Sequence, residues 1–328
     1  ELIAQRPVST RRESRLMVYK KRDDQVILTH FSKLAEFLPD KATLIFNQTK
    51  VYPARLLAQK SSGGKGEIFV LSLEKKAAGY PCLLGFSGKK YVGQTYQLGD
   101  QVFAKIEGIL EGGLFLLSFS HDLTEILQKF GHIPIPPYIR KGHSDELDLQ
   151  DYQTIYAKHL GSVAAPTAGL HFDQELLQEL STKGIAQNKI CLHVGMGTFA
   201  PVKSENIKDH QMHAEEFFVE SSEWKQIRNA KCRIAVGTTS LRTLESIDKI
   251  YGGEIVPEQR YQTNIFLRPG VEVSSVNGLI TNFHLPKSSL LMLVSSLIGR
   301  EKLLELYTLA IKEKFRFYSY GDAMCVLL

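Results

Sequence analysis

The stretch Ile234-Ala-Val-Gly-Thr-Thr-Ser-Leu-Arg-Thr-Leu-Glu245 contains the change of pattern that decides the fold. The segment 233–236, apolar from Ile234 onward, has the composition of a buried strand, and it stops at Gly237. Small hydroxyl residues follow, and an amphipathic helix is predicted from 240 to 249. A strand that passes directly into a helix is the unit from which α/β domains are built.

The same alternation continues on both sides of this stretch. Apolar runs of β type predict the strands, and runs with helical periodicity predict the helices. The predicted strands are 43–46, 190–194, 279–282 and 323–328, and the other predicted helices are 173–183, 223–231, 288–298 and 300–313. Strands that alternate with helices are typical of an α/β domain with a mixed, mostly parallel sheet.

Residues 54–131 follow a different pattern, in which short β-type segments are separated by turns rich in Gly and Ser. Such spacing predicts a small all-β barrel or sandwich. The following Ile133-Pro-Ile-Pro-Pro137 cannot continue a helix or a central strand, so it is predicted to be a return linker. We therefore expect a discontinuous α/β domain, 1–53 and 132–328, with a small β-barrel domain, 54–131, inserted into it.

The composition is that of a globular protein with reduced cysteines. Of the 328 residues, 43% are hydrophobic and 23% charged, so a sizeable core can form. The four cysteines include no close pair, which argues against a disulfide framework or structural zinc. The net charge of +5 permits an RNA or phosphate partner without requiring one. No apolar run approaches the roughly 18 residues of a membrane helix, so we expect a cytoplasmic protein.

Polar side chains gather at the ends of the predicted strands. His193 ends one strand, Asn282 and His284 follow another, and Thr167 and His171 lie in a small-residue segment before a helix. The carboxyl ends of parallel strands line the ligand crevice of α/β sheets, so these positions predict a binding site. A neutral His193 could act as a base or as a hydrogen-bond donor near pH 7, and a purely structural histidine is the alternative.

Two further segments could contact a ligand. Thr238, Thr239 and Ser240 lie at a helix N-terminus, which favours an anionic group, although an ordinary capped helix has the same sequence. The aromatic stretch Phe315-Arg-Phe-Tyr-Ser-Tyr-Gly-Asp322 suits stacking on a nucleobase, or else contributes ordinary core residues.

The set His210-Gln-Met-His213-Ala-Glu215 has the ligand types of a zinc or iron site. However, no H-E-x-x-H helix is present, and ligands so close in sequence are often a polar strand edge. A polar lining for an organic substrate is the favoured interpretation.

Segments spread over most of the chain resemble those of one family, the S-adenosylmethionine:tRNA ribosyltransferase-isomerases of queuosine biosynthesis. The match is weakest between about 60 and 131, above all around 85–96. The matching segments are Leu2-Ile-Ala-Gln-Arg-Pro7, Ser14-Arg-Leu16, Asn47-Gln-Thr-Lys-Val-Tyr-Pro-Ala-Arg55, 133–140, 162–172, 193–202, His210-x-x-His213-x-Glu215, 235–245, 281–292 and 316–324.

The resemblance implies a fold, an activity and partners. The implied fold is an α/β domain with an inserted small β-barrel. Members of this family move the ribosyl portion of S-adenosylmethionine onto 7-aminomethyl-7-deazaguanine at the wobble position of tRNA, giving epoxyqueuosine-tRNA, adenine and methionine. S-adenosylmethionine is then a co-substrate, tRNA carrying the queuosine precursor base is the partner, and no metal or tightly bound cofactor is expected. We further expect a monomer without membrane attachment.

The resemblance also implies where the site residues lie. His193 or His213 is expected to be the base, Asp322 to contact the adenine or the cation, and the helix cap at Thr238 to hold the methionine carboxylate near Arg242. The candidates for proton transfer are His193, His213, Glu215, His171 and His284. Those for S-adenosylmethionine binding are Thr167, Gly197, Thr198, Thr238, Thr239, Ser240, Arg242, Asn282, His284 and Asp322. Those for tRNA phosphates are Arg6, Arg11, Arg12, Arg15, Lys50 and Arg55, with solvated surface charge as the alternative for each.

Two other functions compete with this one. Another S-adenosylmethionine-dependent tRNA enzyme, a methyltransferase, would usually show a Gly-rich turn after its first strand, and the sequence has none. A non-catalytic RNA-binding protein would not need polar residues clustered at strand ends.

Overall fold

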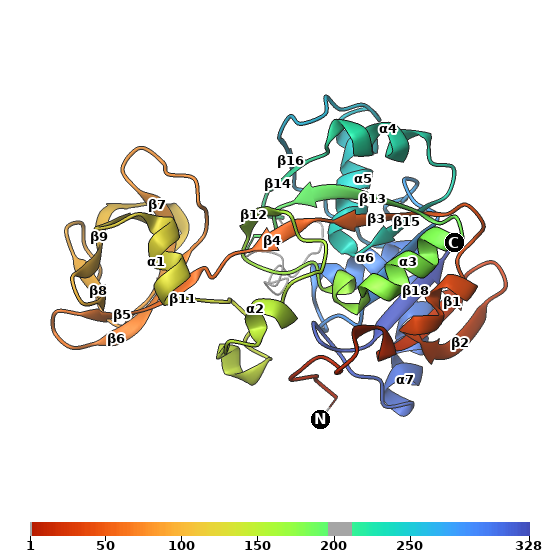
Figure 1. The fold of residues 1–328 in the computed structure, drawn as a ribbon, viewed down its shortest axis with the longest axis horizontal. Coiled ribbons are helices and arrows are strands. Elements are labelled where there is room, and N and C mark those ends of the chain that lie inside the picture. Colours follow the sequence, from red (N-terminus) through yellow and green to blue (C-terminus); the bar gives the residue numbers. More distant parts are fainter. Residues whose placement is uncertain (1, 196–211) are drawn as a thin grey trace.

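A computed structural model describes residues 2–195 and 212–328, which form a mixed α/β domain and a separate antiparallel barrel (Figure 1). The sheet of the α/β domain has the strand order β16-β14-β13-β3-β15-β17-β18-β1-β2. Its strands are β1 (Arg15–Lys20), β2 (Gln25–His30), β3 (Thr43–Asn47), β13 (Ala186–Leu192), β14 (Glu215–Phe218), β15 (Arg233–Val236), β16 (Tyr261–Thr263), β17 (Gly278–Asn282) and β18 (Ala323–Leu327).

The four central strands, β13, β3, β15 and β17, are parallel, so their carboxyl ends meet at one edge of the sheet. Strand β18 runs antiparallel to β17 and parallel to β1, which brings the amino ends of β18 and β1 to that same edge. The outer pairs β13–β14, β14–β16 and β1–β2 are antiparallel. In open α/β sheets, ligands bind at the carboxyl ends of the parallel strands, which here are the ends of β13, β3, β15 and β17.

Helices cover both faces of the sheet because strand side chains alternate between them. On β1, Met17 and Tyr19 pack into the cluster that contains the apolar residues of α4, α5, α6 and α7. Leu16 and Val18 pack into the cluster on the other face, with α3 and the 3-10 helix η2. The bounds are η2 Phe31–Glu36, α3 Gln174–Thr182, α4 Ser221–Asn229, α5 Thr238–Ile250, α6 Ser289–Ile298 and α7 Arg300–Lys312.

The barrel is antiparallel throughout and is closed by the pairing of β5 with β8. The strands in spatial order are β5 (Arg55–Lys60), β6 (Lys65–Val70), β7 (Tyr80–Gly85), β10 (Phe115–Phe119), β9 (Val102–Ile109) and β8 (Thr95–Gly99). Helix α1 (Leu123–Phe130) packs into the barrel core, and β11 (Gly131–His132) returns along β5. The predicted fold class, a mixed α/β domain with an inserted small barrel, is confirmed.

The two parts are joined by β4 (Thr49–Val51), which leads toward the barrel, and by β12 (His159–Ser162), which pairs with it in parallel (Figure 1). Short helical segments surround this connection: η1 (Arg11–Glu13), η4 (Arg140–Gly142), α2 (Asp148–Asp151) and η5 (Thr167–His171). Within the described part of the chain, no helix has the length and apolar character needed to span a membrane.

Candidate active site

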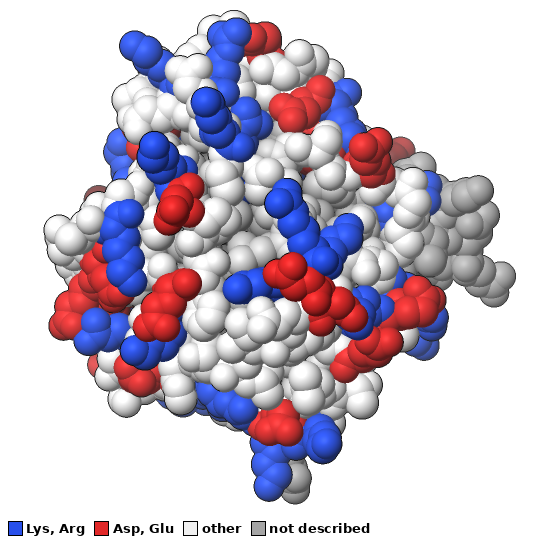
Figure 2. Space-filling view, turned by 90° about the vertical axis from the view of Figure 1, so that its right-hand side faces the viewer, with Lys and Arg blue, Asp and Glu red and all other residues white. Residues whose placement is uncertain are grey.

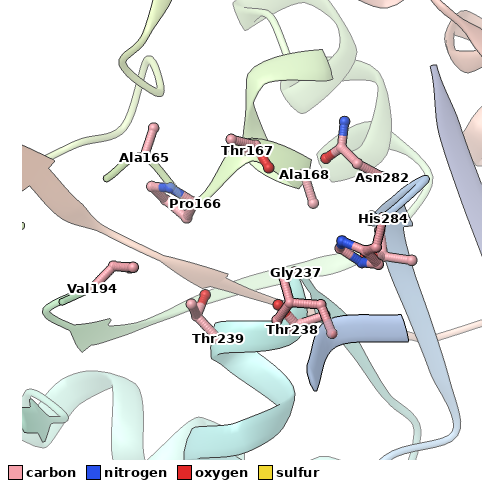
Figure 3. A pocket seen from close by; sticks show the side chains of 12 residues that line it. Ala165, Pro166, Thr167, Ala168, Val194, Gly237, Thr238, Thr239, Asn282 and His284 are labelled. Atoms are coloured by element: carbon pink, nitrogen blue, oxygen red, sulfur yellow. The ribbon is translucent and has the colours of Figure 1, made fainter. Parts of the chain in front are cut away.

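Two adjoining hollows lie at the carboxyl edge of the parallel strands. They share Thr167, Asn282, His284 and Leu290. Figure 3 shows the first hollow between η5, the start of α5 and the chain that follows β17. None of the described residues that line either hollow is an Asp, Glu, Lys or Arg. The lining therefore suits a ligand group with no net charge.

The first turn of α5 borders this hollow. Gly237 has φ +90°, a left-handed conformation that favours glycine, and it lets β15 turn directly into the helix. Gly237 has no side chain with which to cap this helix, and Thr238 and Thr239 lie against the hollow (Figure 3). Ser240 instead donates its hydroxyl to the Val236 carbonyl at 2.9 Å. The N–H groups and positive dipole end of the first turn are thus placed for an anionic group.

His171 lies behind the hollow in a buried chain of hydrogen bonds. Its Nδ1 is 2.8 Å from the Ser14 hydroxyl, and its Nε2 is 3.1 Å from Asn282 Nδ2. Burial, with smaller effects from the charges of Arg316 and Arg11, lowers the pKa of His171 to about 3. The ring is therefore neutral at pH 7, and both of its nitrogens are engaged by the protein.

His284 is the histidine that contacts both hollows. Its Nε2 lies 2.7 Å from Thr281 Oγ1, and its backbone N–H donates to the Tyr307 hydroxyl at 2.7 Å. Desolvation by the surrounding protein lowers the pKa of His284 to about 4. A neutral imidazole is thus held at the hollow, where it can accept or donate a proton.

His193 lies beside the β4–β12 pair and is not among the residues that line the hollows. Its Nδ1 is 2.8 Å from Thr49 Oγ1, which is also 2.8 Å from Ser162 Oγ. Burial, together with the nearby charges of Arg260 and His159, lowers the pKa of His193 to about 4. The histidine is neutral, but its neighbour Val194 is the residue that reaches the hollow.

Glu215 and Arg242 form an ion pair in which each side chain is only 3% exposed. Glu215 also accepts the Gly195 N–H at 3.0 Å. Arg242 is therefore paired with a carboxylate and is not among the residues that line the hollow at Thr238.

The other predicted site residues that the structure describes do not line the two hollows. Asp322 is buried, and it accepts the backbone N–H groups of Arg15 at 3.0 Å and Arg316 at 2.7 Å. His213 is exposed just before β14. Gly197 and Thr198 lie outside the described residues, as does His210. In the ranges that the structure describes, no group of three His, Cys, Asp or Glu side chains is arranged to hold a metal ion.

The predicted tRNA contacts divide into paired and exposed side chains. Lys50 is exposed on β4. The five arginines contact the protein itself: Arg6 with Asp145 and Asp148, Arg11 with the carbonyls of Gln150 and Gln153, Arg12 with Asp173 and Glu175, Arg15 over the Phe315 ring, and Arg55 with Glu67 and the Gly142 carbonyl. On the side of the α/β domain opposite the barrel, basic and acidic side chains are interspersed (Figure 2).

A third cleft, with about 820 Å³ of open space, lies between the barrel and the α/β domain. Phe69 and Arg55 come from the barrel side, and Pro136, Val163 and Ala164 from the other. The cleft is mostly apolar and large enough for a heterocyclic base.

The hydroxyl partners of His171 and His193 do not follow from the sequence pattern. Ser14, Thr49 and Ser162 were not predicted as site residues, although all three lie in or next to segments that resemble the family. Ser162 and Thr49 are 113 positions apart, so only the folded chain shows that they meet.

The fold and the site define a mixed α/β protein that carries an antiparallel barrel and has a candidate ligand site at the carboxyl ends of its parallel strands, bordered by the neutral His284. Comparison with known proteins gives the family. Residues 1–326 match the family described as queuosine biosynthesis protein, and the chain belongs to it.

Curated relatives and a solved structure agree with this assignment. A protein of Acetivibrio thermocellus, named S-adenosylmethionine:tRNA ribosyltransferase-isomerase, is 44% identical over 99% of this chain and 96% of its own length. A protein of Legionella pneumophila strain Lens with the same name is 42% identical over 100% of this chain and 96% of its own. The crystal structure of S-adenosylmethionine tRNA ribosyltransferase from Thermotoga maritima is 30% identical, with a TM-score of 0.54 over 99% of this chain and 96% of that one.

Proposed function

We propose that the chain transfers and isomerises the ribosyl moiety of S-adenosylmethionine onto 7-aminomethyl-7-deazaguanine at the wobble position of tRNA. The products are epoxyqueuosine-tRNA, adenine and methionine. Membership of the family supports this proposal, as do relatives of 42–44% identity along the whole chain. The observation that carries it is the pair of uncharged hollows at the strand ends, where the neutral His284 faces the first turn of α5.

The chemistry needs a base, a proton donor for departing adenine and shelter from water. A sulfonium acidifies the neighbouring C–H and is a good leaving group, so a neutral imidazole near it can start the reaction. His284 occupies such a place at the hollow, whereas His171 has both ring nitrogens engaged. We assign His284 to proton transfer there, and base catalysis by His193, His213 or Glu215 stays a prediction.

The two substrates bind in different places, one in the first hollow and the other in the cleft beside the barrel. The first turn of α5, with Thr238 and Thr239, receives the methionine carboxylate. The target base enters the apolar cleft between the barrel and the α/β domain, beside Phe69 and Pro136. Lys50, exposed on β4, contacts tRNA phosphates, whereas the five candidate arginines reach phosphates only by leaving their present contacts within the protein.

Incubation of the purified protein with S-adenosylmethionine and precursor-bearing tRNA tests this function. Chromatography should detect one adenine and one methionine for each tRNA modified. S-adenosylhomocysteine without adenine would show a methyltransferase instead. Binding of tRNA that falls steeply with salt, without any turnover of S-adenosylmethionine, would show a non-catalytic RNA-binding protein.

We also propose that residues 54–131 form a domain of their own and that the protein is a cytoplasmic monomer. The barrel begins at β5 and returns at β11, and the two strands pair through Leu56 with Gly131. Limited proteolysis should leave fragments that end near residues 54 and 131, and sedimentation equilibrium should give the mass of one chain.

A further inference from the structure

The Asn282 side chain presents an oxygen to the hollow. It is 2% exposed, and its Nδ2 lies 3.1 Å from His171 Nε2 and 3.1 Å from the Tyr318 carbonyl oxygen. Its Oδ1 has no hydrogen-bond partner among the described residues. Asn282 lines both hollows, and Figure 3 shows its oxygen directed toward Thr167 and Ala168. A buried acceptor without a partner costs about 1–3 kcal/mol, which a ligand donor would offset.

Two contacts fix which end of this amide faces the hollow. The Tyr318 carbonyl can only accept, so it requires the NH₂ group of Asn282 on its side. The second N–H of that group points to His171 Nε2, which must then accept. The proton of the neutral ring is left on Nδ1 and is donated to Ser14 Oγ. A protonated His171 would set two N–H groups against each other, and burial disfavours that state by lowering the pKa of His171.

The rest of the hollow identifies the chemical class of its ligand. The first turn of α5 favours a negative group, and the Asn282 oxygen takes a donor. The described lining residues carry no Asp, Glu, Lys or Arg, which suits a group whose own charges cancel. Val194 and Leu290 add apolar wall for an aliphatic chain. An α-amino acid zwitterion has all of these properties.

We infer that this hollow binds the α-amino acid end of S-adenosylmethionine, with its ammonium on Asn282 Oδ1 and its carboxylate on the first turn of α5. His171 is a positioning residue that holds the Asn282 oxygen toward the ammonium. The inference rests on the proposed function, because the amino acid end belongs to the proposed co-substrate. It goes beyond that function by assigning the ammonium and the part played by His171.

Calorimetric titration of the full chain tests the inference with four probes: L-methionine, L-methioninamide, 4-(methylthio)butanoate and adenine. The two analogues that lack the carboxylate or the ammonium should bind about tenfold or more weakly than L-methionine, as expected for the loss of one charged hydrogen bond. Asn282→Leu should weaken L-methionine binding by a similar factor while leaving adenine binding within about twofold.

Variants of His171 separate positioning from packing. His171→Gln keeps an acceptor for Asn282 and should bind L-methionine within about threefold of the wild type, whereas His171→Leu should lose about tenfold. Asn188→Leu is the matched control. Asn188 is 1% exposed, and its Oδ1 also has no hydrogen-bond partner within 2–195 and 212–328, but it lies on β13 beside Glu223 and does not line the hollows. It should leave the affinity unchanged. Fluorescence of Trp224, the single tryptophan, checks that each variant is folded.

Equal binding of L-methionine and 4-(methylthio)butanoate would overturn the inference. So would a loss of adenine binding, with normal L-methionine binding, in Asn282→Leu, since the oxygen would then receive the adenine amine. If Asn282→Leu does not fold, the analogue series on the wild type decides alone. Normal probe binding without adenine release on precursor-bearing tRNA would contradict the proposed function and leave the amino acid site standing.

Discussion

Thr49 Oγ1 lies 2.8 Å from His193 Nδ1 and 2.8 Å from Ser162 Oγ, so the two hydroxyls and the imidazole form one chain. Ser162 Oγ accepts the Val194 N–H at 2.7 Å, which leaves its own proton for Thr49. Thr49 then donates to Nδ1, and the proton of the neutral ring stays on Nε2. This arrangement favours His193 as an N–H donor over His193 as a base.

Thr49→Val removes the hydroxyl while keeping the shape of the side chain. The neutral form of His193 loses a donor, while burial and the charges of Arg260 and His159, which lower the pKa of His193 to about 4, are retained. We expect kcat/KM to fall by about tenfold, the equivalent of one hydrogen bond. Histidine ¹⁵N shifts followed with pH measure the tautomer and the pKa. Thr308→Val, at an exposed position on α7, is the control. If the Nε2–H tautomer is unchanged in Thr49→Val, the proposed order of hydrogen-bond donation, from Ser162 to Thr49 and from Thr49 to His193, is wrong.

Gly161→Ala tests how closely the backbone holds the His193 ring. A Cβ at position 161 would lie 2.5 Å from His193 Cε1 and 2.6 Å from Nδ1, so the ring must move. We expect a loss of stability of about 1–3 kcal/mol and a larger loss of turnover than for Thr49→Val. In Gly108→Ala the nearest atom would be 3.5 Å away, so this variant should be tolerated. Wild-type turnover by Gly161→Ala would show that the orientation of His193 is unimportant.

Stability should fall in acid because His171 is buried in its neutral form. Its folded-state pKa of about 3 lies below the value of about 6.5 in the unfolded chain. Between these values the unfolded state binds more protons, so the free energy of unfolding decreases as the pH falls through that window. His171 alone should account for about 2 kcal/mol between pH 6.5 and 5. Urea unfolding of wild type and His171→Gln at both pH values measures this difference. If the free energy of unfolding depends on pH equally in the two proteins, groups other than His171 cause the loss of stability in acid.

Arg242→Ala should destabilise the α/β domain strongly. It leaves the Glu215 carboxylate buried without its guanidinium partner, which costs about 3–5 kcal/mol. Trp224 lies on α4 of this domain, so its fluorescence reports the unfolding directly. Arg228→Ala breaks the Arg228–Glu254 pair, in which both side chains are 58% exposed, and should cost less than about 1 kcal/mol. Similar losses of stability in both variants would show that burial does not increase the contribution of the Arg242–Glu215 pair to stability.

Lys50→Ala should weaken tRNA binding and reduce the slope of log affinity against log salt by about one. Lys50 is exposed on β4, at the entry to the barrel. Lys312→Ala, on α7, is the control of equal charge, because α7 lies far from the barrel in Figure 1. A salt slope that Lys50→Ala leaves unchanged would remove Lys50 from the interface.

The elements that could be predicted from the sequence carry their own periodicity. Strand β15 and helix α5 follow from an apolar run, a glycine and an amphipathic pattern, all within one short stretch. Strands β14 and β16 are short and lie at the sheet edge, so their conformation depends on partners distant in sequence. Helix α1 was missed in a region expected to be all β, although the Asp122 cap that begins it is visible in the sequence.

Some residues of the candidate site could likewise be predicted from the sequence, and others could not. Asn282 and His284 were predicted from their place after a strand, Thr238 and Thr239 from a helix N-terminus and Thr167 from a small-residue segment, and the fold brings all five to the two adjoining hollows. Partners of charged groups could not be predicted, because any acidic side chain can pair with any basic one until the chain folds. The pairing of Arg242 with Glu215, and of Asp322 with two backbone N–H groups, therefore appeared only in the structure.

The pairing of β1 with β18 has a consequence for biosynthesis. Leu16 meets Ala323, 307 positions later (16 to 323), so translation at about 5–20 residues per second separates the two strands by about 15–60 s. All strands of the barrel lie between Arg55 and His132, so the barrel can fold during that interval. The fully buried Leu16, Met17 and Val18 meanwhile wait without their β18 partner. On the ribosome, the N-terminal strand of the catalytic sheet is thus an apolar segment that chaperones can bind until synthesis reaches β18.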